Sequence, residues 1–150
     1  MKRKKIVAGN WKMNMNLVES KNLISDLKEI SAENVDVKIA PSFTNLYITN
    51  SLLESSKIEV VSQDIHHEQK GAFTGEISAE MLLSIGIKTS IIGHSERRKY
   101  FNETDLILSK KVNSAVQNSM NIIFCIGEEL SDRNNSNHFE IIKSQLTNGV

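Results

Sequence analysis

Short apolar, β-branched runs alternate with longer amphipathic stretches along this chain, and this alternation constrains its fold more than any other feature. The runs recur at intervals of roughly 30 residues, which is the size of a βα unit. Their nearly continuous apolar character is typical of strands covered on both faces. The predicted strands are 5–8, 35–40, 58–62, 89–92 and 121–126. The sequence therefore predicts an α/β fold of parallel units, as in a doubly wound sheet or part of a (β/α)8 barrel.

The segment after each predicted strand carries apolar side chains at helical spacing, which predicts one amphipathic helix in each of the five. The first two expected buried stripes are Leu23, Leu27 and Ile30, and then Leu46, Leu52 and Leu53. The third is Met81, Leu82 and Ile85, in a helix capped by Ser78 and ended by Gly86, and the fourth is Leu108, Val112, Ala115 and Val116, in a helix capped by Asn102. The fifth is Phe139, Ile142 and Leu146, in a helix over 136–146.

Composition excludes several classes of protein. The 150 residues carry 18 basic and 18 acidic side chains, so a nucleic-acid-binding domain with a basic stripe is not expected. The longest apolar run is 122–126, far shorter than the roughly 20 residues of a membrane span. The single cysteine, Cys125, cannot form an internal disulfide, and no secretory leader follows the basic start. We therefore expect one domain over 1–150 in a reducing, cytoplasmic setting.

Polar residues follow the predicted strands, at the edge where parallel α/β folds place their active residues. Asn10 and Lys12 follow the first strand, and the Lys12 ammonium suits an anionic substrate. His94 follows the fourth strand, where the positive end of a short helical turn favours a neutral ring that donates a hydrogen bond. The alternatives are a solvated lysine and a histidine held by neighbouring backbone.

The polar segment 63–75 and the acids after the fifth strand allow other interpretations. His66 and His67 lack the usual spacing of metal ligands, so no metal site is predicted. Long ordered loops are usually functional, and Phe73 near the tip of this loop indicates an arm that inserts into a partner. Glu128 and Glu129 could supply a general base, or they could begin a helix or form ion pairs.

Four stretches together resemble the triosephosphate isomerase family closely. They lie in the family's order from the first predicted strand to the fifth, so the resemblance covers essentially the whole chain. They read Ala-Gly-Asn-Trp-Lys-Met-Asn at 8–14, Gly-Ala-Phe-Thr-Gly-Glu at 71–76, Ile-Ile-Gly-His-Ser-Glu-Arg-Arg at 91–98 and Phe-Cys-Ile-Gly-Glu at 124–128.

The resemblance implies a (β/α)8 barrel that interconverts dihydroxyacetone phosphate and glyceraldehyde 3-phosphate through an enediolate. Such an enzyme is an aldose–ketose isomerase of glycolysis and gluconeogenesis, needs no cofactor, and works as a cytoplasmic homodimer without nucleic-acid or membrane partners. At the positions that match the family, the resemblance implies that Asn10, Trp11 and Lys12 bind the substrate and that Lys12 is also catalytic. It implies that His94 is the electrophile, with the neutral ring established for this family, and that Ser95 and Glu96 support Lys12 and the base. Phe73, Thr74 and Gly75 match the dimer loop.

The same resemblance places the proton-abstracting glutamate on a sixth strand, and the lid and phosphate-binding loops beyond it. We therefore expect an incomplete barrel of five units that is inactive alone, with open edges at its first and fifth strands. One alternative is a non-catalytic half-barrel that serves in binding or assembly. Another is a different phosphosugar enzyme, which the pairing of 10–12 with 94–96 disfavours.

Overall fold

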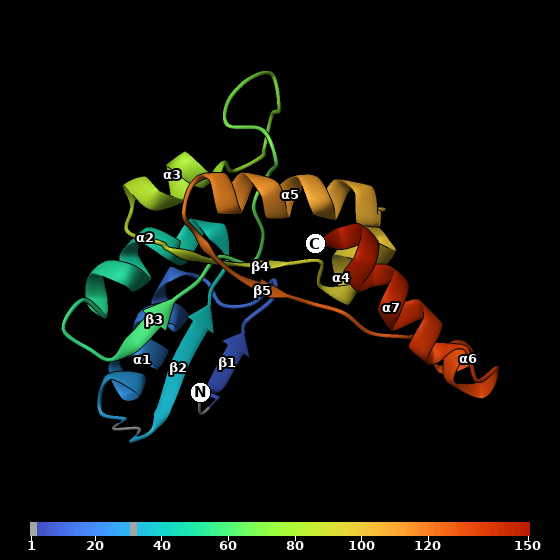
Figure 1. Cartoon of the computed structure of the whole chain (residues 1–150). Helices are drawn as coiled ribbons and strands as arrows, with labels where there is room; N and C mark the ends of the chain where they lie inside the picture. Colours follow the sequence, from blue (N-terminus) through green and yellow to red (C-terminus); the bar gives the residue numbers. More distant parts are fainter. Residues whose placement is uncertain (1–2, 31–32) are drawn as a thin grey trace. The chain divides into compact units, whose positions relative to one another are not determined.

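Strands and helices alternate along the chain in the computed structural model, which describes residues 3–30 and 33–150 (Figure 1). The elements are β1 (Lys5–Asn10), α1 (Leu17–Lys28), β2 (Val35–Ala40), α2 (Phe43–Leu52), β3 (Ile58–Val60), α3 (Ala79–Ser84), β4 (Thr89–Ile92), α4 (Ser95–Tyr100), α5 (Asp105–Gln117), β5 (Asn121–Phe124), α6 (Leu130–Asn134) and α7 (His138–Gly149). The predicted succession of parallel βα units is confirmed.

The chain divides into two compact units, and each is described by itself. The first covers the positions up to Gln63 together with Met81–Thr89. The second covers Asp64–Glu80 and Ser90–Val150. The expectation of one domain over 1–150 stays a prediction.

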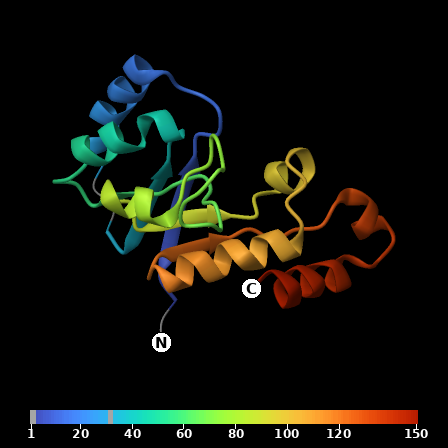
Figure 2. The same cartoon turned by 90° about the horizontal axis from the view of Figure 1, so that it is seen from above.

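The first unit is built on a parallel sheet in the order β1-β2-β3. Val7 of β1 lies beside Val37, and Ile39 of β2 lies beside Val60. Figure 2 shows α1 and α2 side by side, and these helices contact one another. The core of this unit includes Ile24, Ile39, Leu46, Leu53 and Val60, none more than 4% exposed.

The second unit contains β5, the part of its partner β4 from Ser90 onward, and the helices α4, α5, α6 and α7. All four residues of β4 are buried, including the polar Thr89 and Ser90, as expected for a strand covered on both faces. Leu108 and Ala115 of α5 are fully buried, and α5 contacts both β5 and α7 (Figure 2). This packing holds the ends of β4 and β5 in place.

Strand β1 differs from the expectation of cover on both faces. Ile6 is 51% exposed and Val7 is 59% exposed. The physical reason is that β1 ends its sheet and that, among the described residues, no helix packs substantially against it. In the described sheets β5 also has a partner on one side only, as do β3 and β4, so the open edges expected at the first and fifth strands of an incomplete barrel stay a prediction.

Several helix details predicted from periodicity are wrong. The cap of α5 is Thr104, whose hydroxyl accepts from the Ile107 N–H, whereas Asn102 has a φ of 54° and belongs to the preceding turn. Helix α1 ends before Ile30, which is 53% exposed. Helix α6 was not predicted, because a helix of only 5 residues shows no periodic stripe.

Four apolar residues expected in buried stripes lie largely in solvent instead. The outward residues are Met81, Val116, Phe139 and Leu146, with exposed fractions of 53%, 62%, 79% and 45%. The stripes are therefore narrower than their apolar spacing indicated.

Helix α1 begins with a reciprocal cap that yields a test of the fold. The Asn16 side chain accepts from the Val18 and Glu19 N–H groups, and Glu19 Oε2 accepts from the Asn16 N–H at 2.8 Å. We expect Asn16→Ala to lower the free energy of unfolding by about 1 kcal/mol, because the first turn loses an acceptor. Urea denaturation measures this. Asn22→Ala, an exposed change within the same helix, should cost less, and an equal loss in both variants would contradict the capping role.

Candidate active site

The first candidate residues lie where β1 ends. Asn10 is the last residue of β1, and the Trp11 N–H donates to the Ala40 carbonyl at the end of β2 over 3.0 Å. Lys12 takes a left-handed backbone with φ of 55°, and its N–H donates to Asn10 Oδ1 over 2.9 Å. Because non-glycine residues adopt this conformation at a cost, the side-chain amide of Asn10 helps to fix the turn that presents Lys12.

Gln63 holds the same turn from the other side. Its Nε2 donates to the Lys12 carbonyl over 2.8 Å and to the Ala40 carbonyl over 2.9 Å. One amide group thus ties the loop after β1 to the end of β2. Sequence reasoning missed this residue, although its position just after the third predicted strand was a usable signal.

A glycine allows the chain to turn sharply from β4 toward His94. Gly93 has a φ of 77°, and a Cβ at this position would lie 3.1 Å from Leu108 Cδ1 and 3.3 Å from the Cys125 carbonyl oxygen. Neither the conformation nor the space suits another residue. His94 follows as the cap of α4, and its side chain is 24% exposed.

Hydrogen bonding defines the form of the His94 ring. Nδ1 accepts from the Glu96 backbone N–H over 3.3 Å, which requires an unprotonated Nδ1. Glu96 Oε2 lies 3.5 Å from the same nitrogen, too far for a good hydrogen bond. With Nδ1 as the acceptor, Nε2 is the ring nitrogen left to donate a hydrogen bond, and the role of His94 as an electrophile stays a prediction.

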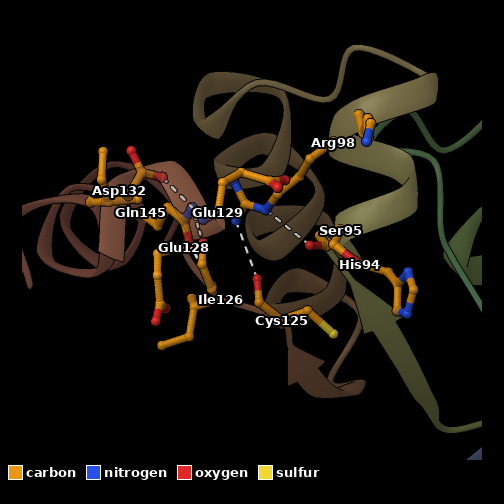
Figure 3. A pocket seen from close by; sticks show the side chains of 13 residues that line it. His94, Ser95, Arg98, Cys125, Ile126, Glu128, Glu129, Asp132 and Gln145 are labelled. Atoms are coloured by element: carbon orange, nitrogen blue, oxygen red, sulfur yellow. Dashed lines mark hydrogen bonds between the residues drawn. The ribbon is translucent and has the colours of Figure 1, made fainter. Parts of the chain in front are cut away.

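Arg98 connects the ends of β4 and β5. Its Nε donates to the Gly93 carbonyl over 2.9 Å and its Nη2 to the Cys125 carbonyl over 3.3 Å, as the dashed lines in Figure 3 show. Its Nη1 donates to Asp105 Oδ1 over 2.6 Å. The arginine thus supports the turn that carries His94.

A pocket of about 600 Å³ opens beside this arginine, lined by residues that include Ser95, Cys125, Glu128 and Glu129. Figure 3 shows the His94 ring turned away from the two glutamates. Glu128 is bound by Arg133, whose Nε donates to it over 2.8 Å, and this hydrogen bond lowers the pKa of Glu128. Burial raises the pKa of the Cys125 thiol. Glu128 is thus an ion-paired carboxylate, one of the two interpretations considered for it.

Arg97 of α4 forms ion pairs with a buried cluster of charged side chains. Lys111 Nζ donates to both Asp64 oxygens, over 2.8 and 2.6 Å, and to Glu103. Arg97 Nε lies 3.0 Å from Asp64 Oδ2 and donates to Glu103 Oε1 over 2.7 Å. The Lys111, Asp64 and Glu103 side chains are only 3 to 5% exposed. Burial raises the pKa of Asp64, while Lys111 and Arg97 act in the opposite direction.

The segment between Asp64 and α3 contains the arm predicted from the sequence, and Figure 1 draws it as a long loop. The His66 N–H donates to the Ile77 carbonyl over 2.8 Å, which closes the base of the arm. The His66 ring lies 4.3 Å from that of His67 and 4.6 Å from that of Phe73. Neighbouring side chains on an extended chain point apart, but the chain bends here and brings the two rings together. Burial lowers the pKa of His67.

The predicted residues fall into two groups, one in each unit. Asn10, Trp11 and Lys12 lie together after β1 in the first unit. The second unit contains His94, Ser95 and Glu96 at the start of α4, and Phe73, Thr74 and Gly75 in the arm. Within 3–30 and 33–150, no three histidine, cysteine or carboxylate side chains gather as a metal site. No helix in the described part has the length and apolar character of a membrane span.

The fold and the strand-end residues define a class: proteins of parallel βα units with their reactive residues beyond the carboxyl ends of the strands. A sequence model of the family "Triosephosphate isomerase" matches residues 5–150. The chain is 49% identical over 150 residues to a triosephosphate isomerase of Flavobacterium johnsoniae, and 51% identical over 150 residues to that of Flavobacterium psychrophilum. It is 45% identical over 147 residues to that of Alkaliphilus metalliredigens.

These matches show that the chain belongs to the triosephosphate isomerase family. The alignments cover 99% of this chain and 60% of each Flavobacterium relative, and 97% and 59% for the Alkaliphilus relative. The chain therefore spans about 60% of the length of these relatives. The matched family agrees with the resemblance drawn from the four motifs.

The buried cluster yields a test of stability. We expect Lys111→Met to lower the free energy of unfolding by about 3–5 kcal/mol at neutral pH, because it leaves two buried carboxylates with Arg97 alone. A carboxyl with a raised pKa binds its proton more readily in the folded state, so the deficit should shrink as the pH falls from about 7 toward about 5.

Urea denaturation at several pH values measures this effect. Lys110→Met, at the exposed neighbouring position, is the matched control and should change little. A deficit for Lys111→Met that stays constant or grows on acidification would contradict the assignment.

Proposed function

We propose that this chain supplies the first five βα units of a triosephosphate isomerase. The enzyme would interconvert dihydroxyacetone phosphate and D-glyceraldehyde 3-phosphate in glycolysis and gluconeogenesis, as a cytoplasmic homodimer that uses no cofactor. The observation that carries the proposal is the His94 ring, which keeps a donor on Nε2 because Nδ1 accepts from the Glu96 N–H. Family membership supports the choice of substrate.

In the proposed mechanism, Lys12 and Asn10 bind the substrate and His94 stabilises the intermediate. The Lys12 ammonium offsets the charge of the substrate, and Asn10 offers both a donor and an acceptor to it. When a base removes the proton next to the carbonyl, negative charge develops on the carbonyl oxygen. His94 Nε2–H then donates to that oxygen and stabilises the enediolate. A proton passes from the neighbouring hydroxyl oxygen to the former carbonyl oxygen, and return of the abstracted proton to the former carbonyl carbon completes the isomerisation.

The base in this proposal comes from the sixth strand of the family and not from the five units described here. Glu128 is a poor substitute, because Arg133 binds it and lowers its pKa, so it holds a proton weakly. We therefore propose that the 150-residue chain has no isomerase turnover by itself, and an assay of the purified chain tests this. Turnover above that of a His94→Gln variant would contradict it.

A chimera tests the roles of His94 and Lys12 separately from the missing base. The 150 residues are fused to the remaining part of the Flavobacterium johnsoniae relative, and isomerase activity is compared between variants. We expect His94→Gln to lower kcat by about 10²–10³, because the donor to the developing oxyanion is lost. Lys12→Met should mainly remove binding of the anionic substrate.

His138→Gln is the matched control, since this histidine lies in α7 and outside the strand-end sites. The control should retain the activity of the parent chimera. An active His94→Gln chimera would refute the electrophile role. Failure of the parent chimera to bind a phosphorylated enediolate analogue would favour a different phosphosugar enzyme.

The exposed edge at β1 favours a second candidate, an assembly module. Ile6 and Val7 present more than half of their surface to solvent on a strand with one free side in the described sheet. In this alternative a second copy docks there or on the arm that carries Phe73, Thr74 and Gly75. A soluble oligomer of defined size with cooperative unfolding would support it.

The edge itself leads to a further prediction. We expect Val7→Lys to reduce self-association of the 150-residue chain, because a charged residue on an open strand edge opposes pairing. Analytical ultracentrifugation measures the association. The control is Lys21→Val, the opposite exchange at an exposed position of α1, which should not reduce association. Unchanged association in Val7→Lys would remove β1 as the contact surface.

A further inference from the structure

A second hollow lies in the first unit, at the opposite end of the sheet from Asn10. Its volume is about 730 Å³, and its polar lining is Arg3, Lys4, Lys5, Asn34, Asp36 and Lys57. None of these residues belongs to the proposed catalytic arrangement, and the family motifs do not include them.

Parallel pairing explains why these residues meet. Lys5 lies beside Val35 at the amino ends of β1 and β2, and the next pair is Ile6 with Asp36. Lys57 directly precedes β3, whose first residue Ile58 pairs with Val37. The amino ends of three parallel strands therefore bring segments far apart in sequence to one edge.

The charge of this hollow departs strongly from that of the chain. Four of its side chains are basic and one is acidic, whereas the whole chain has a formal net charge of zero. Lys4 Nζ donates to Asp36 Oδ2 over 2.7 Å, and this bond raises the pKa of Lys4. Within 3–30 and 33–150, no carboxylate forms an ion pair with Arg3, Lys5 or Lys57. Three cations thus face one hollow with their charges uncompensated.

We propose that this hollow is a binding site for a small anion that carries two or more phosphate groups. The Arg3 guanidinium can bind one phosphate through two N–H groups, while Lys5 and Lys57 supply point charges and Asn34 an amide donor. The volume lies within the range of roughly 300–1,000 Å³ that small-molecule sites occupy. A nucleic acid would need a longer basic surface, which the zero net charge disfavours.

Calorimetric titration of the 150-residue chain with inorganic pyrophosphate tests this site. Because an exposed ion pair contributes a factor of only about two to five, we expect the triple variant Arg3→Gln/Lys5→Gln/Lys57→Gln to bind roughly tenfold or more weakly. The control triple variant Lys21→Gln/Lys110→Gln/Lys143→Gln removes as many exposed charges elsewhere and should retain most of the affinity. Binding should weaken between about 0.02 M and roughly 0.5 M salt, where screening is stronger.

Asp36→Asn provides a test in which affinity increases. It removes the acidic member of the lining and frees Lys4, so pyrophosphate should bind severalfold more tightly, which a loss of folding could not produce. Equal weakening by the two triple variants, absence of binding at low salt, or weaker binding by Asp36→Asn would overturn the proposal. Tighter binding of a single-stranded oligonucleotide than of pyrophosphate would also overturn it. None of these outcomes depends on isomerase activity, so the proposed function is tested separately.

Discussion

Parallel pairing of β1 with β2, and of β2 with β3, is the constraint on which the rest of the first unit depends. It brings the carboxyl ends of the strands to one edge, where Asn10 lies beside Ala40, and the amino ends to the other, where Lys5 lies beside Val35. A strand of 6 residues separates these edges by about 20 Å. The two edges therefore carry different chemistry without competing for the same side chains.

The backbone conformation at the strand ends determines where the side chains of the proposed active residues lie. Lys12 adopts a positive φ, which costs about 1–2 kcal/mol for a residue with a Cβ, and hydrogen bonds from Gln63 and to Asn10 hold it there. Gly93 adopts a positive φ without that cost, and a Cβ there would lie in tight contact with Leu108 Cδ1 and the Cys125 carbonyl oxygen. In both turns, contacts behind the site hold the reactive side chain.

Periodicity was sufficient to predict the parallel units, and strand-end position selected Asn10, Lys12 and His94, whose roles stay predictions. They could not predict Gln63 as a clamp, because its role depends on two carbonyl oxygens that only the folded sheet brings within reach. The role of Lys111 was likewise not predicted, because a lysine in a helix normally faces solvent and its partner Asp64 lies 47 residues away along the chain. Asn102 misled because asparagine is common both at helix caps and in left-handed turns.

A balanced net charge conceals how unevenly the charges are distributed. In the second unit, two cations and two carboxylates meet in the protein interior, where each needs the others because unpaired burial is costly. At the amino edge of the first unit, three cations face a hollow without carboxylate partners among the described residues. Solvent makes that exposed arrangement tolerable, and it also leaves the cations available to a ligand. The charged side chains that stabilise the fold are thus the ion-paired ones in the core, whereas the cations in excess at the surface are those that can bind an anion.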